Sequence, residues 1–299
     1  MRRVLNFQSK SNQLVIKNLY VAFLVLFIIN NVQCQSKAES YSEETQHFII
    51  HWEKDNASSS DVEKAKSISE EIYTVYLDYL GKERLPNTKI AIHLGGPGLD
   101  MQNGDVKIPH VDLDGNIHIY RFPHGYFGEL AHEMIHAIRI YKGFMDDWFL
   151  EEAFAEAVAS NLFPDNVGFN RYGYPLTIAA GSWVDKLRYI PLRLLKENHN
   201  ELSMKCSAQS YALRADFFVY LEKTYGKDKY LSFVYDANSK NYSSYVNYFD
   251  KSFDELEKDW LENLRERIDN IEDFEEQKHN YLTKSAVRFI KICEADTDF

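Results

Sequence analysis

The segment from His132 to His136 reads His-Glu-x-x-His, and this pattern forms a site only if the segment is a helix. Four positions apart on a helix, the two imidazoles lie on one face with their Cβ atoms about 5–6 Å apart. That separation suits two ligands of one Zn²⁺ ion, and the glutamate between them is placed to act as a base. The pattern therefore predicts a helix with His132 and His136 as metal ligands and Glu133 as general base.

The residues around this pattern divide into two faces if residues 127–141 are helical. At 100° per residue, one stripe is apolar and consists of Phe127, Leu130, Met134, Ile138 and Tyr141. The opposite side gathers Glu129, His132, Glu133 and His136. Either histidine alone is better explained by the solvated face of an ordinary amphipathic helix, but the whole set favours a polar cleft.

A third ligand is expected on the next helix, because a tetrahedral catalytic zinc takes three protein ligands and keeps its fourth position for water. Glu152 and Glu156 are four residues apart and share a helix face, so one can bind metal while the other hydrogen-bonds the far nitrogen of a ligand histidine. Glu151 competes with Glu152 but has no carboxylate four residues later. The alternatives are a solvated face for Glu156 and an aspartate ligand at 146–147.

The first 34 residues differ from the rest of the chain. They combine basic residues with an unbroken apolar run at 19–29, which is the pattern of a secretory signal peptide. In a helix this run spans about 16 Å, about half of a hydrocarbon core of roughly 30 Å, so no stable membrane span is expected. The pattern predicts cleavage after Cys34 and a secreted or periplasmic protein; an uncleaved anchor or a lipid on Cys34 are the alternatives.

Charge and cysteine content narrow the function further. Loss of the four basic residues of 1–34 changes the net charge from −11 to −15, which argues against nucleic acid as a partner. Cys206 and Cys293 then remain, and the sequence allows either a disulfide between them or two free thiols.

Hydrophobic periodicity and turn residues predict an α+β fold. A polar linker is expected at 35–46 and a single domain at 47–299, with an α/β part (47–125) followed by a mostly helical part (126–299) and a cleft between them. Strands are expected at 47–53 and 89–94, a helix from Ser58 to about residue 80, and a hairpin at 111–122 that turns at Asp114-Gly115. Helix breaks are expected at Gly143, Pro164, Pro175, Pro191 and Gly226.

On the residues of 132–156 the chain resembles the gluzincin zinc metallopeptidases, the peptidase MA-like group that contains thermolysin-like and aminopeptidase N-like catalytic domains. The resemblance implies a zincin-like fold and a Zn²⁺ ion held by His132, His136 and Glu152, with Glu133 as base and Glu156 hydrogen-bonded to a ligand histidine. Two departures are Ala153, where the family often has glycine, and a short interval between His136 and Glu152.

The resemblance extends more loosely to two other segments. The helix at 210–226 implies Tyr211 as a donor to the oxyanion, although Tyr211 is one of twenty tyrosines and an ordinary core or surface position is the alternative. The strand at 115–122 is similar to an edge strand that pairs with extended peptides.

The function implied is hydrolysis of peptide or protein substrates by a secreted zinc metallopeptidase. The rival is a catalytically silent binding or scaffold protein with the same fold and a structural metal. A metzincin is excluded because position 142, where its third histidine would stand, is lysine.

Overall fold

The computed structural model describes residues 39–97, 109–121, 129–143, 147–163, 174–184, 189–199, 201–202, 206–236 and 241–288. The chain divides into two units, Met1–Glu39 and Ser40–Phe299. The first unit lies outside the described residues except for Glu39, and so does the predicted signal peptide at 1–34. Within the described residues, no helix is both long enough and apolar enough to cross a membrane.

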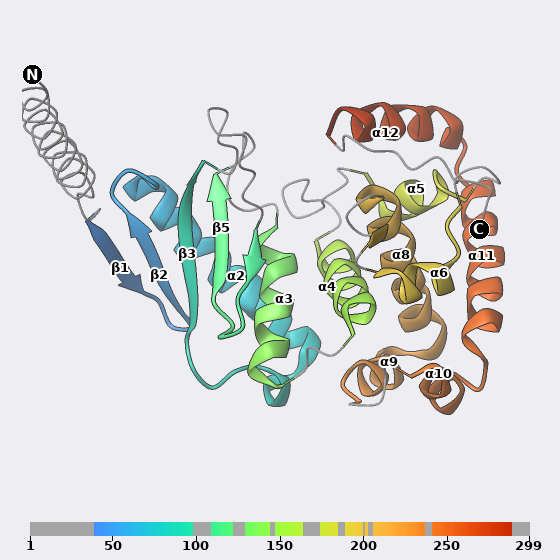
Figure 1. Ribbon diagram of the computed structural model, residues 1–299, viewed down its shortest axis with the longest axis horizontal. Helices are drawn as coiled ribbons and strands as arrows, with labels where there is room; N and C mark the ends of the chain where they lie inside the picture. The colour runs from blue at the N-terminus through green and yellow to red at the C-terminus, as the bar shows by residue number, and fades with distance from the viewer. Residues whose placement is uncertain are drawn as a thin grey trace, which may run out of the picture. The chain divides into compact units, whose positions relative to one another are not determined.

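The second unit begins with a five-stranded mixed sheet in the order β1-β2-β3-β5-β4 (Figure 1). The parallel pairs are β2 with β3 and β3 with β5, whereas β1 with β2 and β4 with β5 are antiparallel. The strands are β1 (Ser40–Glu44), β2 (Phe48–Glu53), β3 (Ile90–Pro97), β4 (His110–Val111) and β5 (Ile117–Arg121).

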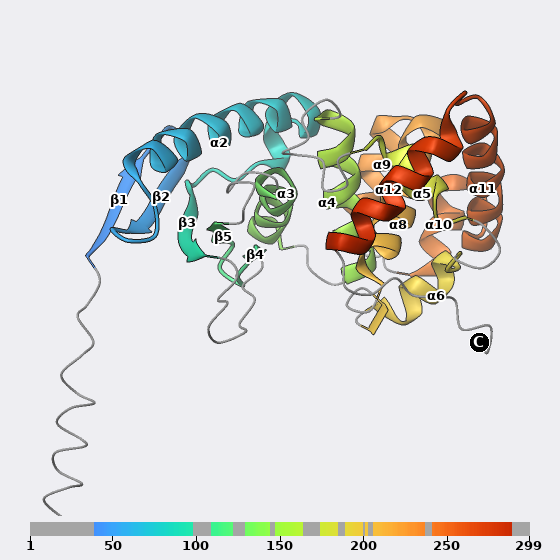
Figure 2. The same ribbon diagram turned by 90° about the horizontal axis from the view of Figure 1, so that it is seen from above.

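Helix α2 (Ser59–Leu80) connects the parallel strands β2 and β3, and Figure 2 shows it lying along one face of the sheet. It begins where the sequence predicts, because Ser58 and Asp61 form a reciprocal capping box. It ends at Gly81, whose φ of +84° is a conformation that residues with a Cβ rarely adopt. A short 3-10 helix, η1 (Lys82–Arg84), follows.

The described residues that follow the sheet are mostly helical, so the predicted α+β class is confirmed. Pro175 and Pro191 stand immediately before helices and Gly226 ends one, as predicted, whereas Pro164 lies outside the described residues. The helices are α3 (Leu130–Tyr141), α4 (Trp148–Leu162), α5 (Leu176–Gly181), α6 (Leu192–Glu197), α8 (Ser207–Tyr225), α9 (Lys227–Val234), α10 (Tyr242–Phe249), α11 (Phe253–Asp269) and α12 (Phe274–Arg288).

Three expectations about the strands were wrong in detail. Ser40–Glu44, expected in the polar linker, forms β1, because backbone pairing with β2 needs no apolar side chains and all five residues are exposed. Gly95 and Gly96 continue β3 through an irregularity in its register instead of ending it at Leu94. The two-residue strand β4 pairs with β5 at Ile117 and His118, so this first part of the 115–122 strand is not at the edge of the sheet, whereas no pairing with β4 extends to residues 119–121.

Helix α2, which packs on the sheet, is hydrogen-bonded to the N-terminal end of α3. The hydroxyl of Tyr76, a residue with no exposed surface, donates a hydrogen bond of 2.7 Å to the carbonyl oxygen of Ala131, one residue before His132. Burial raises the pKa of Tyr76 far above its usual range, so the hydroxyl keeps its proton and remains a donor.

We expect Tyr76→Phe to lower the free energy of unfolding by about 1 kcal/mol, since it removes a buried hydrogen bond with little change in packing. Urea denaturation of the metal-free protein measures this effect. Tyr41→Phe, at a side chain that is 41% exposed, is the matched control and is expected to be nearly neutral. Equal stability of the two variants would show that this bond does not hold α3 in place.

Candidate metal centre

Helix α3 carries the His-Glu-x-x-His pattern on a face that is buried. His132, Glu133 and His136 have exposed fractions of only 4%, 6% and 5%. A solvated amphipathic face is therefore wrong for these residues. Because α3 packs on β5 on one side and on α4 on the other, its polar face meets the next helix and not bulk water.

Three ligand atoms converge between α3 and α4. The Nε2 atoms of His132 and His136 lie 3.0 Å apart, and the carboxylate oxygens of Glu152 lie 3.3 Å from the first and 3.5 Å from the second. Two atoms bound to one zinc ion at about 2.0–2.1 Å with a tetrahedral angle would be about 3.3 Å apart. The three side chains are therefore spaced as ligands of a single metal ion.

An unsatisfied atom supports the same interpretation. Oε2 of Glu152 is buried and makes no hydrogen bond to the described residues, although Nε2 of His132 and Nη2 of Arg214 lie 3.3 and 3.8 Å away. A buried acceptor of this kind is costly unless a donor or a cation meets it. The donor set of two imidazole nitrogens and one carboxylate oxygen thus fits a divalent transition metal.

Glu156 fixes the orientation of one ligand. Its Oε2 lies 2.8 Å from Nδ1 of His132, and Glu156 is only 2% exposed. The alternative of a solvated Glu156 is therefore wrong. A carboxylate on Nδ1 favours the tautomer that carries its proton there, which leaves Nε2 free to bind a metal.

Glu151 has a different partner, although it stands next to Glu152. Its two oxygens accept hydrogen bonds of 2.5 and 2.6 Å from Nε and Nη2 of Arg139, and both side chains are almost fully buried. The guanidinium of Arg139 also lies over the rings of Phe154 and Tyr235. Glu151 is committed to this ion pair, so Glu152 completes the cluster.

The aspartate alternative also fails where it can be tested. Asp147 accepts hydrogen bonds from the backbone N–H groups of Phe149 and Leu150 in the first turn of α4 and forms an ion pair with Lys196. It serves as the N-cap of the helix. Asp146 lies outside the described residues.

The pKa values of Glu133 and Glu152 shift in opposite directions. Burial raises the pKa of Glu133, although the neighbouring imidazoles partly oppose this effect. Burial would also raise the pKa of Glu152, but the imidazoles of His136 and His132 outweigh it and hold that pKa well below the usual range. Glu152 is thus the carboxylate that the two histidines keep ionised.

Helix α8 brings Tyr211 to the cluster, where its ring centroid lies 6.0 Å from that of His132. Arg214, which the sequence analysis did not single out, lies with its guanidinium 4.0 Å from the Tyr211 ring centroid and Nη2 3.8 Å from Oε2 of Glu152. The two residues are three positions apart on one helix, which was the signal that could have identified Arg214.

His199 is a second residue that sequence analysis missed. Nη1 of Arg214 donates to Nδ1 of His199 over 3.1 Å. Burial and the charge of Arg214 lower the pKa of His199 to about 4, so this imidazole is neutral and accepts the bond. No local sequence pattern connects His199 to the site, because the contact depends on how the segment after α6 packs on α8.

No protein-family model matches the chain, and no curated protein shows significant similarity to it. A function for this chain therefore has to follow from the geometry of the cluster formed by His132, His136 and Glu152.

Substitution of Glu151 is expected to lower stability, whereas substitution of Glu152 is expected to abolish metal binding. Glu151→Gln leaves the buried charge of Arg139 without its carboxylate and should lower the free energy of unfolding by about 3–5 kcal/mol. Glu152→Gln should change the stability of the metal-free protein far less but abolish stoichiometric metal binding. Urea denaturation with a chelator and metal analysis after dialysis measure the two effects. The assignment is contradicted if Glu152→Gln binds metal like the unchanged protein.

Glu156→Gln should bind zinc about 10–100-fold more weakly, because the amide keeps the shape of the carboxylate but holds the His132 imidazole less strongly. Competition with a chromophoric chelator measures the affinity. Glu275→Gln, the same change at a side chain 81% exposed on α12, is the control and should leave the affinity unaltered.

Proposed function

We propose that this chain is a zinc-dependent metallopeptidase of the gluzincin type, with His132, His136 and Glu152 as the metal ligands. The observation that carries the proposal is the convergence of these three ligand atoms within 4.8 Å of one another. Two histidines and a glutamate are a donor set of catalytic zinc sites that keep a fourth position open. The order of the ligands along the chain, His-Glu-x-x-His followed by glutamate on the next helix, agrees with the gluzincin resemblance.

A zinc ion in this cluster would act as a Lewis acid on the scissile carbonyl and make a bound water more acidic. Glu133 is the chain's own base. It is buried on the same helix face as the two histidines and close enough to interact electrostatically with both. Glu133 accepts a proton as the water oxygen bonds to the carbonyl carbon, and it returns that proton to the amine nitrogen when the C–N bond breaks.

Tyr211 is the proposed donor to the oxygen that becomes negatively charged. Its ring faces the cluster beside His132, and a phenol can donate a hydrogen bond to an oxyanion. Arg214 stacks on that ring and approaches Glu152, so it positions the phenol relative to the ligands. The cation also offsets part of the negative charge that Glu133 and Glu152 bring to the site.

The proposed location is outside the cytoplasm. The predicted signal peptide supports it, and so does Cys206, which is in a disulfide whose partner lies outside the described residues. Disulfides persist in oxidising compartments and are rare in the cytosol. Peptides or proteins in such a compartment are the proposed substrates.

Glu133→Gln should lower kcat by at least about a hundredfold and leave zinc stoichiometry unchanged, because the amide cannot accept the water proton. Activity is measured as cleavage of casein and of a mixed peptide library, with mass spectrometry to identify the products. The library also detects an enzyme whose specificity is too narrow for it to cleave casein. Glu275→Gln again serves as the control.

The outcomes separate the proposal from its rival. Cleavage by the unchanged protein that is lost in Glu133→Gln and after chelation supports the peptidase. Stoichiometric zinc with no cleavage of any library peptide would instead indicate a catalytically silent binding protein. Full activity in Glu133→Gln would remove Glu133 as the base.

A further inference from the structure

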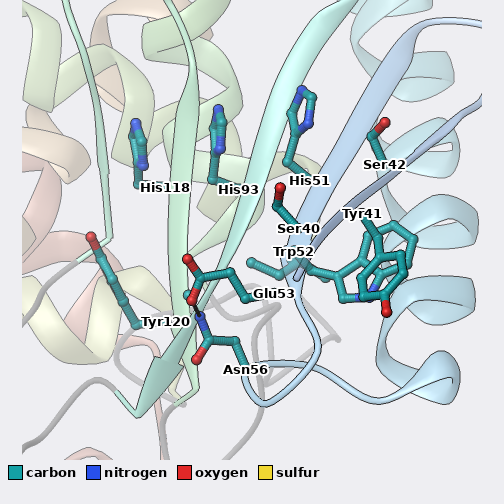
Figure 3. Close-up of a pocket in the computed structure, with 12 residues that line it drawn as sticks. Ser40, Tyr41, Ser42, His51, Trp52, Glu53, Asn56, His93, His118 and Tyr120 are labelled. Carbon is teal, nitrogen blue, oxygen red and sulfur yellow. Dashed lines mark hydrogen bonds between the residues drawn. The ribbon is translucent and has the colours of Figure 1, made fainter. Parts of the chain in front are cut away.

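Four histidines form a continuous stack across the sheet. His51 on β2 pairs directly with His93 on β3, His93 with His118 on β5, and His118 with His110 on β4. Neighbouring ring centroids are 4.7, 4.7 and 4.8 Å apart, with interplanar angles of 17°, 10° and 9°. We call these four residues the histidine ladder. Figure 3 shows three of its imidazoles side by side and projecting the same way.

The ladder lies on the face of the sheet that points away from the hydrophobic core. Along β2, β3 and β5 each ladder histidine follows a buried isoleucine: Ile50, Ile92 and Ile117. Because side chains alternate between the two faces of a strand, the histidines point to the opposite side. They are only partly buried, so solvent and ions can reach the rings.

A cavity of about 380 Å³ opens along the ladder (Figure 3). His51, His93 and His118 line it together with Glu53 and Tyr120. Gly95 also lines the cavity. The ring of Tyr120 lies against the Gly95 backbone, in the position that a Cβ would take. The space is sufficient for a hydrated ion and several waters, each of which takes about 30 Å³ in the liquid.

The charges around the ladder favour a cation over an anion. The described residues that line the cavity include no lysine or arginine. They include one carboxylate, that of Glu53. At the other end, Oδ2 of Asp112 lies 3.1 Å from Nε2 of His118.

The ring nitrogens decide which metals suit the ladder. A neutral imidazole is the form that binds metals. Imidazole nitrogen prefers zinc, copper and nickel to the oxygen-seeking ions magnesium and calcium.

We propose that the histidine ladder binds a divalent transition-metal ion between adjacent imidazoles, with His93 as the shared ligand. Two nitrogens bound to one ion at about 2.0–2.1 Å with a tetrahedral angle are about 3.3 Å apart, whereas the ring centroids of neighbouring ladder residues are 4.7 Å apart. Binding therefore requires two partly exposed side chains to rotate about χ1 and χ2, so that their ring nitrogens turn toward each other. His93 has a histidine on both sides, so it takes part in either arrangement, with His51 or with His118.

This site is separate from the proposed peptidase centre, because the two clusters share no residue. Asp112 contacts one ring nitrogen of His118, just as Glu156 contacts one ring nitrogen of His132. A carboxylate in this position commonly orients a metal-binding imidazole. Copper is the most informative probe because it binds nitrogen ligands most tightly among the divalent ions of its row.

The test uses the full chain with His132→Ala and His136→Ala, which removes the other cluster, and adds Cu²⁺. Titration calorimetry should give about one bound ion, and electron paramagnetic resonance should show nitrogen coordination. His93→Asn should lower the affinity by about tenfold or more, which corresponds to at least about 1.4 kcal/mol. His279→Asn, an exposed histidine on α12, is the matched control and should change nothing.

Single changes along the ladder locate the ion. His51→Asn or His118→Asn should weaken binding more than His110→Asn, because His110 is at the end of the stack and does not touch His93. Far-UV circular dichroism confirms that each variant is folded, and His51→Asn replaces His93→Asn as the decisive variant if the latter does not fold. The proposal is overturned if these variants bind Cu²⁺ as tightly as the His279→Asn control.

Discussion

A carboxylate between two imidazoles in the protein interior sets the constraint that the packing of α3, α4 and α8 has to meet. Burying Glu152 is costly, and the imidazoles of His132 and His136 offset that cost together with the nearby guanidinium of Arg214. Each compensating group comes from a neighbouring helix. The helices must therefore pack closely enough for charge to be neutralised over 3–4 Å, and the buried alanines of α4 allow this approach.

The contrast between Glu151 and Glu152 shows how helix geometry assigns different tasks to adjacent residues. A step of about 100° around α4 turns Glu151 toward Arg139 and Glu152 toward the histidines. Both carboxylates are buried against a partner, but one neutralises a fixed cation of the protein, whereas the other faces imidazoles that can share a metal. The same periodicity places Glu156 one turn beyond Glu152 and against Nδ1 of His132.

The sheet contributes in two ways. Its inner face supports α2, and Tyr76 of α2 is hydrogen-bonded to the start of the helix that carries His132 and His136. Its outer face aligns four histidines that are far apart in sequence, because parallel and antiparallel pairing put them in one register. A shift of one residue in any strand would turn that strand's histidine into the core and break the ladder.

The sequence by itself determined the α+β class, the limits of α2, and the candidates His132, Glu133, His136, Glu152 and Glu156, because helix caps and four-residue spacings are local. The tertiary structure decided between Glu151 and Glu152, since the choice depends on where Arg139 lies. It also revealed Arg214, His199 and the histidine ladder, and it made Ser40–Glu44 a strand. These features arise from contacts between distant segments, and helical or strand periodicity carries no information about which segments will meet.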